Sequence, residues 1–122
     1  MKYLLLVSDD GPPGAVANDV AGSPERHLQA RSELQEDGVW CGGELLQPAI
    51  SVTGLRMSEG RVVLHDGPSM GPGDRLVSYY LVDCDDLDHA IVVSARLPIG
   101  EHGSVEIHPV HEPRAATTGP AP

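Results

Sequence analysis

Apolar residues in this chain occur in short runs separated by turn-forming residues, a pattern typical of an α+β domain. The run at residues 2–8 is followed by SDDGPPG, which predicts a strand and then a loop over residues 9–22. Further β-like runs are interrupted by Gln-Pro, Glu-Gly and Asp-Gly-Pro, and we interpret them as a meander of antiparallel strands. They lie at residues 39–45, 49–56, 61–65 and 76–84.

A closing strand is predicted at residues 104–110, where apolar and polar residues alternate. Val105 and Ile107 should lie on one face, and Glu106 and His108 on the other.

The first helix is predicted from its start signals. Ser23 can cap a helix that begins at Pro24, and Gly38 should end it after Asp37. The spacing i, i+3, i+7 of an inward-facing stripe selects His27, Ala30 and Leu34.

A second helix is predicted over residues 86–97, with Asp85 as its cap and Pro98 after its end. We expect its inner face to comprise Leu87, Ala90, Ile91 and Ser94.

The predicted order β-α-β-β-β-β-α-β contains a ferredoxin-like split βαβ unit, in which both helices cover one face of an antiparallel sheet. The other face is then covered by a partner or curled into a barrel, so we expect a homodimer. The domain should span residues 1–110. The Pro, Ala and Thr-rich tail at 111–122 should be disordered.

Composition narrows the possible functions. A net charge of −10 disfavours nucleic-acid binding, which depends on a basic surface. The opening apolar run is too short for a membrane span or a signal peptide, so we expect a cytoplasmic protein that does not bind membranes. Cys41 and Cys84 are expected to be free, buried thiols. No motif for nucleotide or hydride cofactors is present, and we expect no cofactor.

Several short segments, taken in order, resemble the landmarks of DGPF-domain proteins of the YCII-related family, and the likeness covers residues 1–110. They are MKYLLL at 1–6, GELLQP at 43–48, DGP at 66–68, YYLVD at 79–83, DLD at 86–88 and VEIHPV at 105–110. The resemblance implies a dimeric α+β barrel.

The chain departs from the family pattern after Pro68. Ser69 replaces an aromatic residue, and MGPGD at 70–74 replaces a stretch similar to Glu-Thr-Lys-Glu. A loop that would shape a pocket is therefore altered, which indicates a different substrate or a lost activity.

His27, Leu28 and Gly38 are similar to the YCII branch, which has a histidine near the start of its first helix. The resemblance implies that this histidine pairs with an aspartate as an acid/base dyad. Cys41 lies near the position of that aspartate, so the partner would be Glu44, Asp66 or Asp10.

Each candidate catalytic residue also has a structural interpretation. His27 suits a general base at neutral pH, or is a hydrogen-bonded histidine at the edge of the core. Glu44 follows two glycines and is either an acid/base group or a contact to backbone amides. Asp66 first of all forms a turn with Gly67 and Pro68, and lining a pocket is the alternative.

Ligand-binding residues are expected on the strands and loops around these groups. Tyr79 should share a sheet face with Glu106 and His108, as a polar patch or as solvent-exposed side chains; the spacing does not satisfy a metal site. The expected ligand-binding residues are Asp10, Trp40, Ser69, Tyr79 and His108.

The sequence thus supports two hypotheses. The first is a cofactor-independent lyase, isomerase or cyclase that acts on a small metabolite through His27 and a carboxylate. The second is a non-catalytic dimeric binding or regulatory module, linked to a sigma factor, and the altered loop after Pro68 favours it.

Overall fold

The computed structural model describes residues 1–9, 20–47, 52–67 and 75–112. Most of the loop predicted at 9–22, the start of the strand predicted at 49–56 and the tail from 113 lie outside the described residues. The elements are β1 (Lys2–Asp9), α1 (Pro24–Glu36), β2 (Trp40–Leu45), β3 (Thr53–Ser58), β4 (Arg61–Asp66), β5 (Arg75–Asp83), α2 (Leu87–Ala95) and β6 (Ser104–Pro109).

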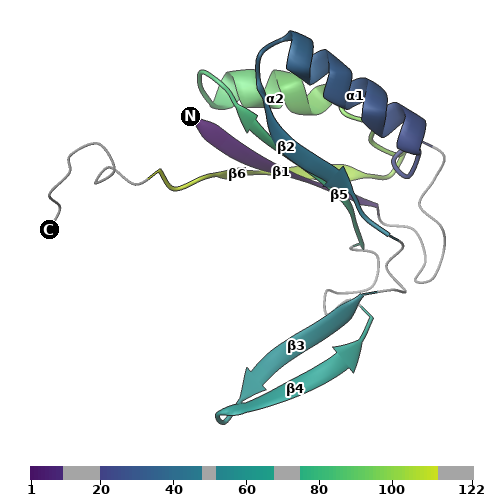
Figure 1. Cartoon of the computed structure of the whole chain (residues 1–122), viewed down its shortest axis with the longest axis vertical. Coiled ribbons are helices and arrows are strands. Elements are labelled where there is room, and N and C mark those ends of the chain that lie inside the picture. Colours follow the sequence, from purple (N-terminus) through teal and green to yellow (C-terminus); the bar gives the residue numbers. More distant parts are fainter. Residues whose placement is uncertain (10–19, 48–51, 68–74, 113–122) are drawn as a thin grey trace, which may run out of the picture.

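The main sheet is antiparallel and has the strand order β2-β5-β1-β6 (Figure 1). β1 lies between β5 and β6, so the first strand of the chain is central. α1 connects β1 to β2, and α2 connects β5 to β6. This order is the split βαβ arrangement that the sequence predicts. The α+β fold class is confirmed.

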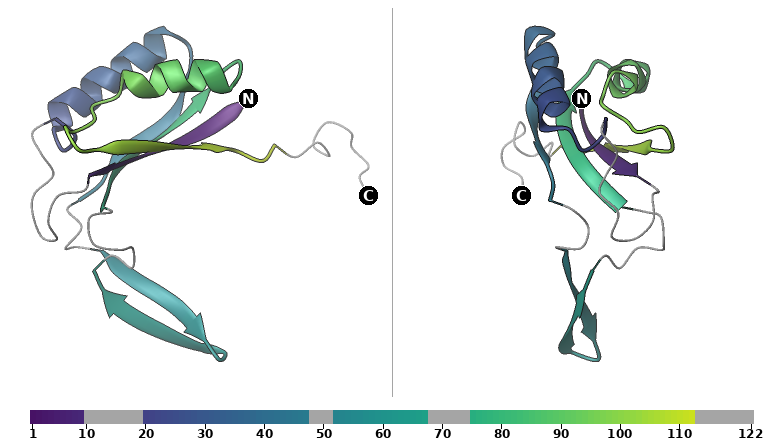
Figure 2. Two further views of the ribbon diagram at one scale, coloured as in Figure 1. Left: turned by 180° about the vertical axis from the view of Figure 1, so that it is seen from behind. Right: turned by 90° about the vertical axis from the view of Figure 1, so that its right-hand side faces the viewer.

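Both helices lie on the same side of the main sheet (Figure 2). The core lies between them and the inward-facing residues of the two central strands. From the sheet it includes Tyr3, Leu5, Val7, Tyr80 and Val82, and from the helices Ala30, Leu34, Ala90 and Val93. We call the covered side the helix side of the sheet and the other the open side.

The signals at the start of α1 are confirmed. The Ser23 hydroxyl accepts a hydrogen bond from the backbone N–H of Arg26 at 3.2 Å, and Pro24 opens the helix. His27, Ala30 and Leu34 are its buried residues, as the spacing predicts.

Two predictions about α2 are wrong. Asp86, and not Asp85, caps the helix by accepting a hydrogen bond from the backbone N–H of His89 at 2.9 Å. Leu87 and Ile91 are exposed, whereas Val93 is buried beside Ala90 and Ser94. The inward arc continues from Ala90 through Val93 to Leu97 at positions i, i+3, i+7, and Ile91 lies about 100° away from its start.

The predicted meander is also wrong, because β3 and β4 do not join the main sheet. They form a separate two-stranded sheet, and β2 pairs directly with β5 (Figure 1). Glu59 and Gly60 both have positive φ, 51° and 78°, the geometry of a tight hairpin turn. This turn pairs β3 with β4. In sequence the hairpin is thus an insertion between β2 and β5, which pair with each other.

Gly43 allows β2 to approach β5 closely. Its φ is 156°, and a Cβ atom there would lie 2.7 Å from the backbone oxygen of Tyr79 and 3.0 Å from the Trp40 ring. Gly42, the preceding residue, has open space at the corresponding position. The two glycines therefore differ in what a side chain would meet.

We expect Gly43→Ala to lower the free energy of unfolding by about 1–3 kcal/mol, because the new Cβ meets rigid backbone of β5. The matched control Gly42→Ala should leave it unchanged or raise it by up to about 1 kcal/mol. Urea denaturation followed by circular dichroism measures both. Equal losses in the two variants would contradict the close approach at Gly43.

Candidate functional site

His27 lies in the first turns of α1 and faces the sheet. Its Nδ1 is 2.7 Å from the hydroxyl oxygen of Tyr80 on β5, and the two ring centroids are 5.2 Å apart. Only 7% of His27 is exposed, and Tyr80 is fully buried. The interior of the domain thus contains a hydrogen-bonded histidine–tyrosine pair.

Burial keeps both members of this pair neutral. It is the main cause that lowers the pKa of His27, which the charge of Arg31 lowers further and that of Glu44 raises. Burial also raises the pKa of Tyr80 to about 12. At neutral pH the tyrosine therefore keeps its proton, and either its O–H donates to Nδ1 or a protonated Nδ1 donates to it. In the second arrangement Nε2 carries no proton and can act as a base.

Trp40 and Arg31 extend the site along the helix side. The Trp40 ring meets Tyr80 edge-on, with centroids 6.2 Å apart, and the Arg31 guanidinium carbon lies 5.5 Å from the centre of the Trp40 ring. Trp40, predicted to contact a ligand, is thus partly covered by Arg31 and packs against the partner of His27.

Three buried polar residues of the sheet, Ser78, Asp9 and Arg75, were not predicted from the sequence as part of a site. Ser78 is fully buried on the helix side, and its hydroxyl has no hydrogen-bond partner among the described groups. Its proximity to Tyr80 nevertheless lowers the pKa of that phenol, against the larger effect of burial. Asp9 and Arg75 are paired across β1 and β5 and form a buried ion pair of 3.8 Å. The burial of Ser78 could have been predicted, because Ser78 lies two residues before Tyr80 on the same strand and so faces the same side. The ion pair could not, because it depends on the register between β1 and β5.

Three other predicted site residues belong to the open side. Tyr79 lies opposite Leu6 on β1 and Glu44 on β2, and Leu6 in turn lies opposite Glu106 on β6. His108 lies two residues beyond Glu106 on β6, and its Nε2 is hydrogen-bonded to Oε1 of Glu106 at 2.8 Å. Glu44, Tyr79 and His108 therefore share a side of the sheet, and the prediction that Tyr79 faces the same way as Glu106 and His108 agrees with the register.

The remaining candidates lie elsewhere. Asp66 ends β4 on the separate hairpin, opposite Thr53, and Asp10 and Ser69 lie outside the described residues. The described structure does not bring His27, Glu44 and Asp66 together as one hydrogen-bonded group. Glu44 acts on His27 through its charge, and Tyr80 is the group that holds the ring.

The thiols and acidic groups do not form a metal centre in the described part of the chain. Cys84 is buried and Cys41 is exposed, and both are free, so the expectation of two buried thiols is wrong for Cys41. The edge position of β2 explains its exposure. Within residues 1–9, 20–47, 52–67 and 75–112, no three His, Cys, Asp or Glu side chains are grouped closely enough to hold a metal ion.

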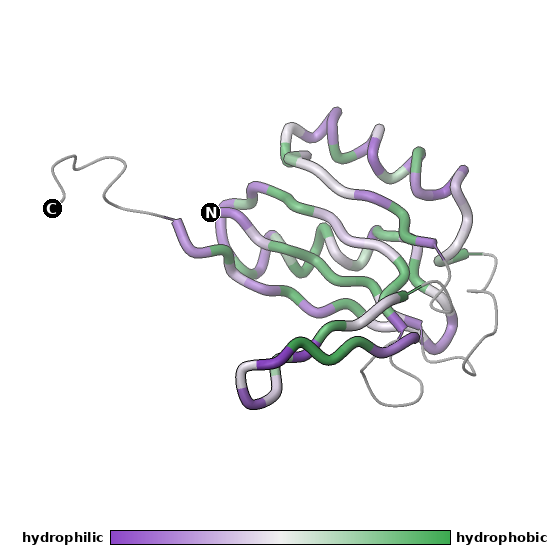
Figure 3. The backbone as a smooth tube through the Cα atoms, turned by 60° about the horizontal axis from the view of Figure 1, so that its bottom comes forward, coloured by the Kyte–Doolittle hydropathy of each residue, from purple (hydrophilic) through white to green (hydrophobic). Residues whose placement is uncertain are grey.

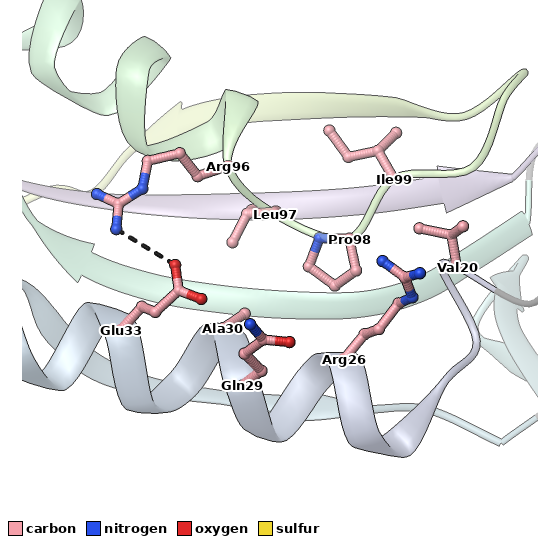
Figure 4. Close-up of a pocket in the computed structure, with 9 residues that line it drawn as sticks. All are labelled: Val20, Arg26, Gln29, Ala30, Glu33, Arg96, Leu97, Pro98 and Ile99. Atoms are coloured by element: carbon pink, nitrogen blue, oxygen red, sulfur yellow. Dashed lines mark ion pairs between the residues drawn. The ribbon is translucent and has the colours of Figure 1, made fainter.

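A groove of about 220 Å³ lies between α1 and the segment that follows α2 (Figure 4). Arg96 crosses it to Glu33 at 3.5 Å and also binds Asp37 at 2.6 Å. Its lining comprises Val20, Arg26, Gln29, Ala30, Glu33, Arg96, Leu97, Pro98 and Ile99. None of the predicted site residues that the structure describes lines this groove, which is thus separate from the His27–Tyr80 pair.

Comparison with known proteins places these features in a family. The family model of the YCII-related domain matches residues 1–114. An uncharacterized protein of Rhizobium meliloti (strain 1021) is 33% identical over 67 residues, which is 53% of this chain and 54% of that protein. The match thus spans about half the length of this relative. Neither helix in the described residues is long and apolar enough to cross a membrane.

We expect Tyr80→Phe to lower the free energy of unfolding by about 1–2 kcal/mol, because it leaves a buried ring nitrogen of His27 without its partner. Tyr79→Phe is the matched control. Tyr79 is half-buried on the open side, and removing its hydroxyl should change the free energy of unfolding by less than about 0.5 kcal/mol. Urea denaturation of the three proteins tests this. A larger loss in the control would show that the buried hydrogen bond is not what stabilises this region.

The lowered pKa of His27 predicts a pH dependence of stability. The unfolded chain has a histidine pKa near 6.5, so below that pH it binds a proton that the folded chain does not accept until lower pH. The free energy of unfolding should therefore fall as pH falls from about 6.5, until the folded-state pKa is reached. His27→Gln should show a shallower loss between pH 7 and pH 5. An NMR titration midpoint of the His27 ring at or above 6.5 would contradict the effect of burial.

Proposed function

We propose that this chain, which belongs to the YCII-related domain family, is a cytoplasmic, cofactor-independent enzyme that moves protons on a small metabolite. The observation that carries the proposal is the 2.7 Å hydrogen bond between His27 and Tyr80 in an environment that keeps the histidine neutral. A neutral imidazole held in one orientation is suited to accept a proton near pH 7.

In the proposed reaction His27 is the general base and Tyr80 is its positioning residue. Nδ1–H donates to the Tyr80 oxygen, Nε2 takes a proton from a carbon next to a carbonyl group, and the electron pair of that C–H bond forms an enolate. In an isomerisation the imidazolium then returns the proton to another carbon of the same molecule. In an elimination the enolate expels a leaving group from the neighbouring carbon, and that group takes the proton. In a cyclisation the enolate carbon attacks a second carbonyl carbon of the same molecule, and the proton goes to the resulting alkoxide. Tyr80 stays protonated throughout because its pKa is about 12.

The carboxylates have supporting roles in this proposal. The negative charge of Glu44 raises the pKa of His27 and so stabilises the imidazolium intermediate. We keep Asp66 as a candidate from the hairpin and Trp40, Tyr79 and His108 as candidate ligand contacts. A homodimer is part of the proposal because the open side of the sheet carries half-buried apolar residues that a partner would cover.

A second candidate function is a non-catalytic dimeric binding or regulatory module. It is favoured by the packing around His27, which is only 7% exposed and whose ring binds a phenol and not a carboxylate among the described groups. The groove described above also lies away from this histidine. In that case the His27–Tyr80 pair would only stabilise the fold, and an open surface would bind the partner.

Proton transfer is measurable without knowledge of the substrate. We expect the protein in D₂O to accelerate deuterium incorporation into at least one compound of a panel of 2-oxo acids and 1,3-dicarbonyl compounds, followed by proton NMR. His27→Gln should reduce this acceleration by about 100-fold or more, because it removes the base. Tyr80→Phe should reduce it less, because it removes the residue that positions the ring and leaves the base in place.

The controls separate loss of chemistry from loss of structure. Each variant is compared by circular dichroism and by its urea midpoint before exchange is measured. Equal exchange by the wild type and a folded His27→Gln variant would overturn the assignment of the base. A wild type that exchanges none of the panel would favour the binding module.

A further inference from the structure

The β3–β4 hairpin carries an exposed apolar face. The register pairs Leu55 with Leu64 and Met57 with Val62, and paired residues of antiparallel strands point to the same side. These four side chains are 61%, 65%, 61% and 56% exposed. Arg56, between Leu55 and Met57, points to the opposite face. We call the four apolar residues the hairpin's docking face.

The hairpin stands apart from the rest of its own chain. It projects beyond the ends of β2 and β5 and pairs with no strand of the main sheet (Figure 1, Figure 2). Figure 3 shows the apolar positions along its strands. A two-stranded hairpin on its own is marginally stable in water, so covering this face would stabilise it.

The same chain has a second uncovered apolar surface, on the open side of the main sheet. The helices cover only the other side, and the central strands here present Leu4, Leu6, Tyr79 and Leu81, all half-buried. Each chain therefore has both a projecting apolar face and an apolar sheet surface without a cover.

The charges of the two surfaces favour this combination. The hairpin, residues 53–66, has no net charge, because Arg56 and Arg61 balance Glu59 and Asp66, so the whole net charge of −10 belongs to the rest of the chain. The receiving surface is edged by Glu44 and Glu106. A hairpin without net charge approaches such a surface with less repulsion than a second acidic surface does.

We propose that the β3–β4 hairpin docks its apolar face on the open side of the sheet of a second copy of this chain. Each copy gives one arm and receives one, so the contacts close around a two-fold axis and leave no arm free. This inference rests on the proposed homodimer and is independent of the proposed chemistry of His27.

Leu64→Glu and Val63→Glu form a matched pair for the test. The two residues are adjacent, carry the same substitution and point to opposite faces of the hairpin. In sedimentation analysis the wild type should have twice the chain mass of 12.9 kDa. Leu64→Glu should weaken dimerisation by roughly 100-fold, because it would bury an unpaired carboxylate, and Val63→Glu should change it little.

A mixing experiment identifies the receiving surface. Leu64→Glu has a disabled arm and an intact sheet, whereas Leu4→Glu has an intact arm and a disabled sheet. Each variant alone should be monomeric with a folded circular dichroism spectrum. Their mixture should form a mixed dimer, in which the arm of the Leu4→Glu chain docks on the sheet of the Leu64→Glu chain.

The other outcomes are distinct. A monomeric wild type at about 100 µM protein, a thousandfold above a dissociation constant of about 100 nM, would overturn both the dimer and the arm. A dimeric Leu64→Glu variant would overturn the arm and leave the dimer standing. A mixture that stays monomeric would overturn the sheet as the target and indicate contacts between two hairpins or with the exposed residues of α2, such as Ile91.

Discussion

The antiparallel pairing of β1 with β5 determines how the polar chemistry of this domain is divided. Leu5 lies opposite Tyr80 and Val7 opposite Ser78 on the helix side, while Leu6 lies opposite Tyr79 on the open side. Because successive side chains of a strand point to opposite faces, a shift of one residue would exchange Tyr79 and Tyr80. The hydrogen bond to His27, the core and the surface available to a partner all depend on this register.

Local signals in the sequence were sufficient for much of the fold. Ser23 and Pro24 define the start of α1, and the spacing of His27, Ala30 and Leu34 gives its inward face. The alternation of β6 was equally readable. By contrast, neighbouring aspartates at 85 and 86 offer equivalent caps, and only the packing of the helix selects Asp86.

The site was less predictable because it depends on contacts between residues distant in sequence. His27 could be found from its helix, but Tyr80 is 53 positions away, and only carboxylates were expected as the partner of His27. The pairing of β2 with β5 across an inserted hairpin is likewise a long-range choice that no local pattern records. Asp9 and Arg75 meet for the same reason, because the end of β1 pairs with the start of β5, which is distant in sequence.

The turn at Glu59 and Gly60 makes the hairpin a self-contained unit, because β3 pairs with β4 and, among the described strands, with no other. Substitutions in its strands can therefore accumulate without disturbing the ladder of the main sheet or the environment of His27. With the hairpin docked as proposed above, the choice of assembly partner can diverge between related proteins while the interior stays the same. Paralogues in one cell could thereby remain separate even if their interiors were identical.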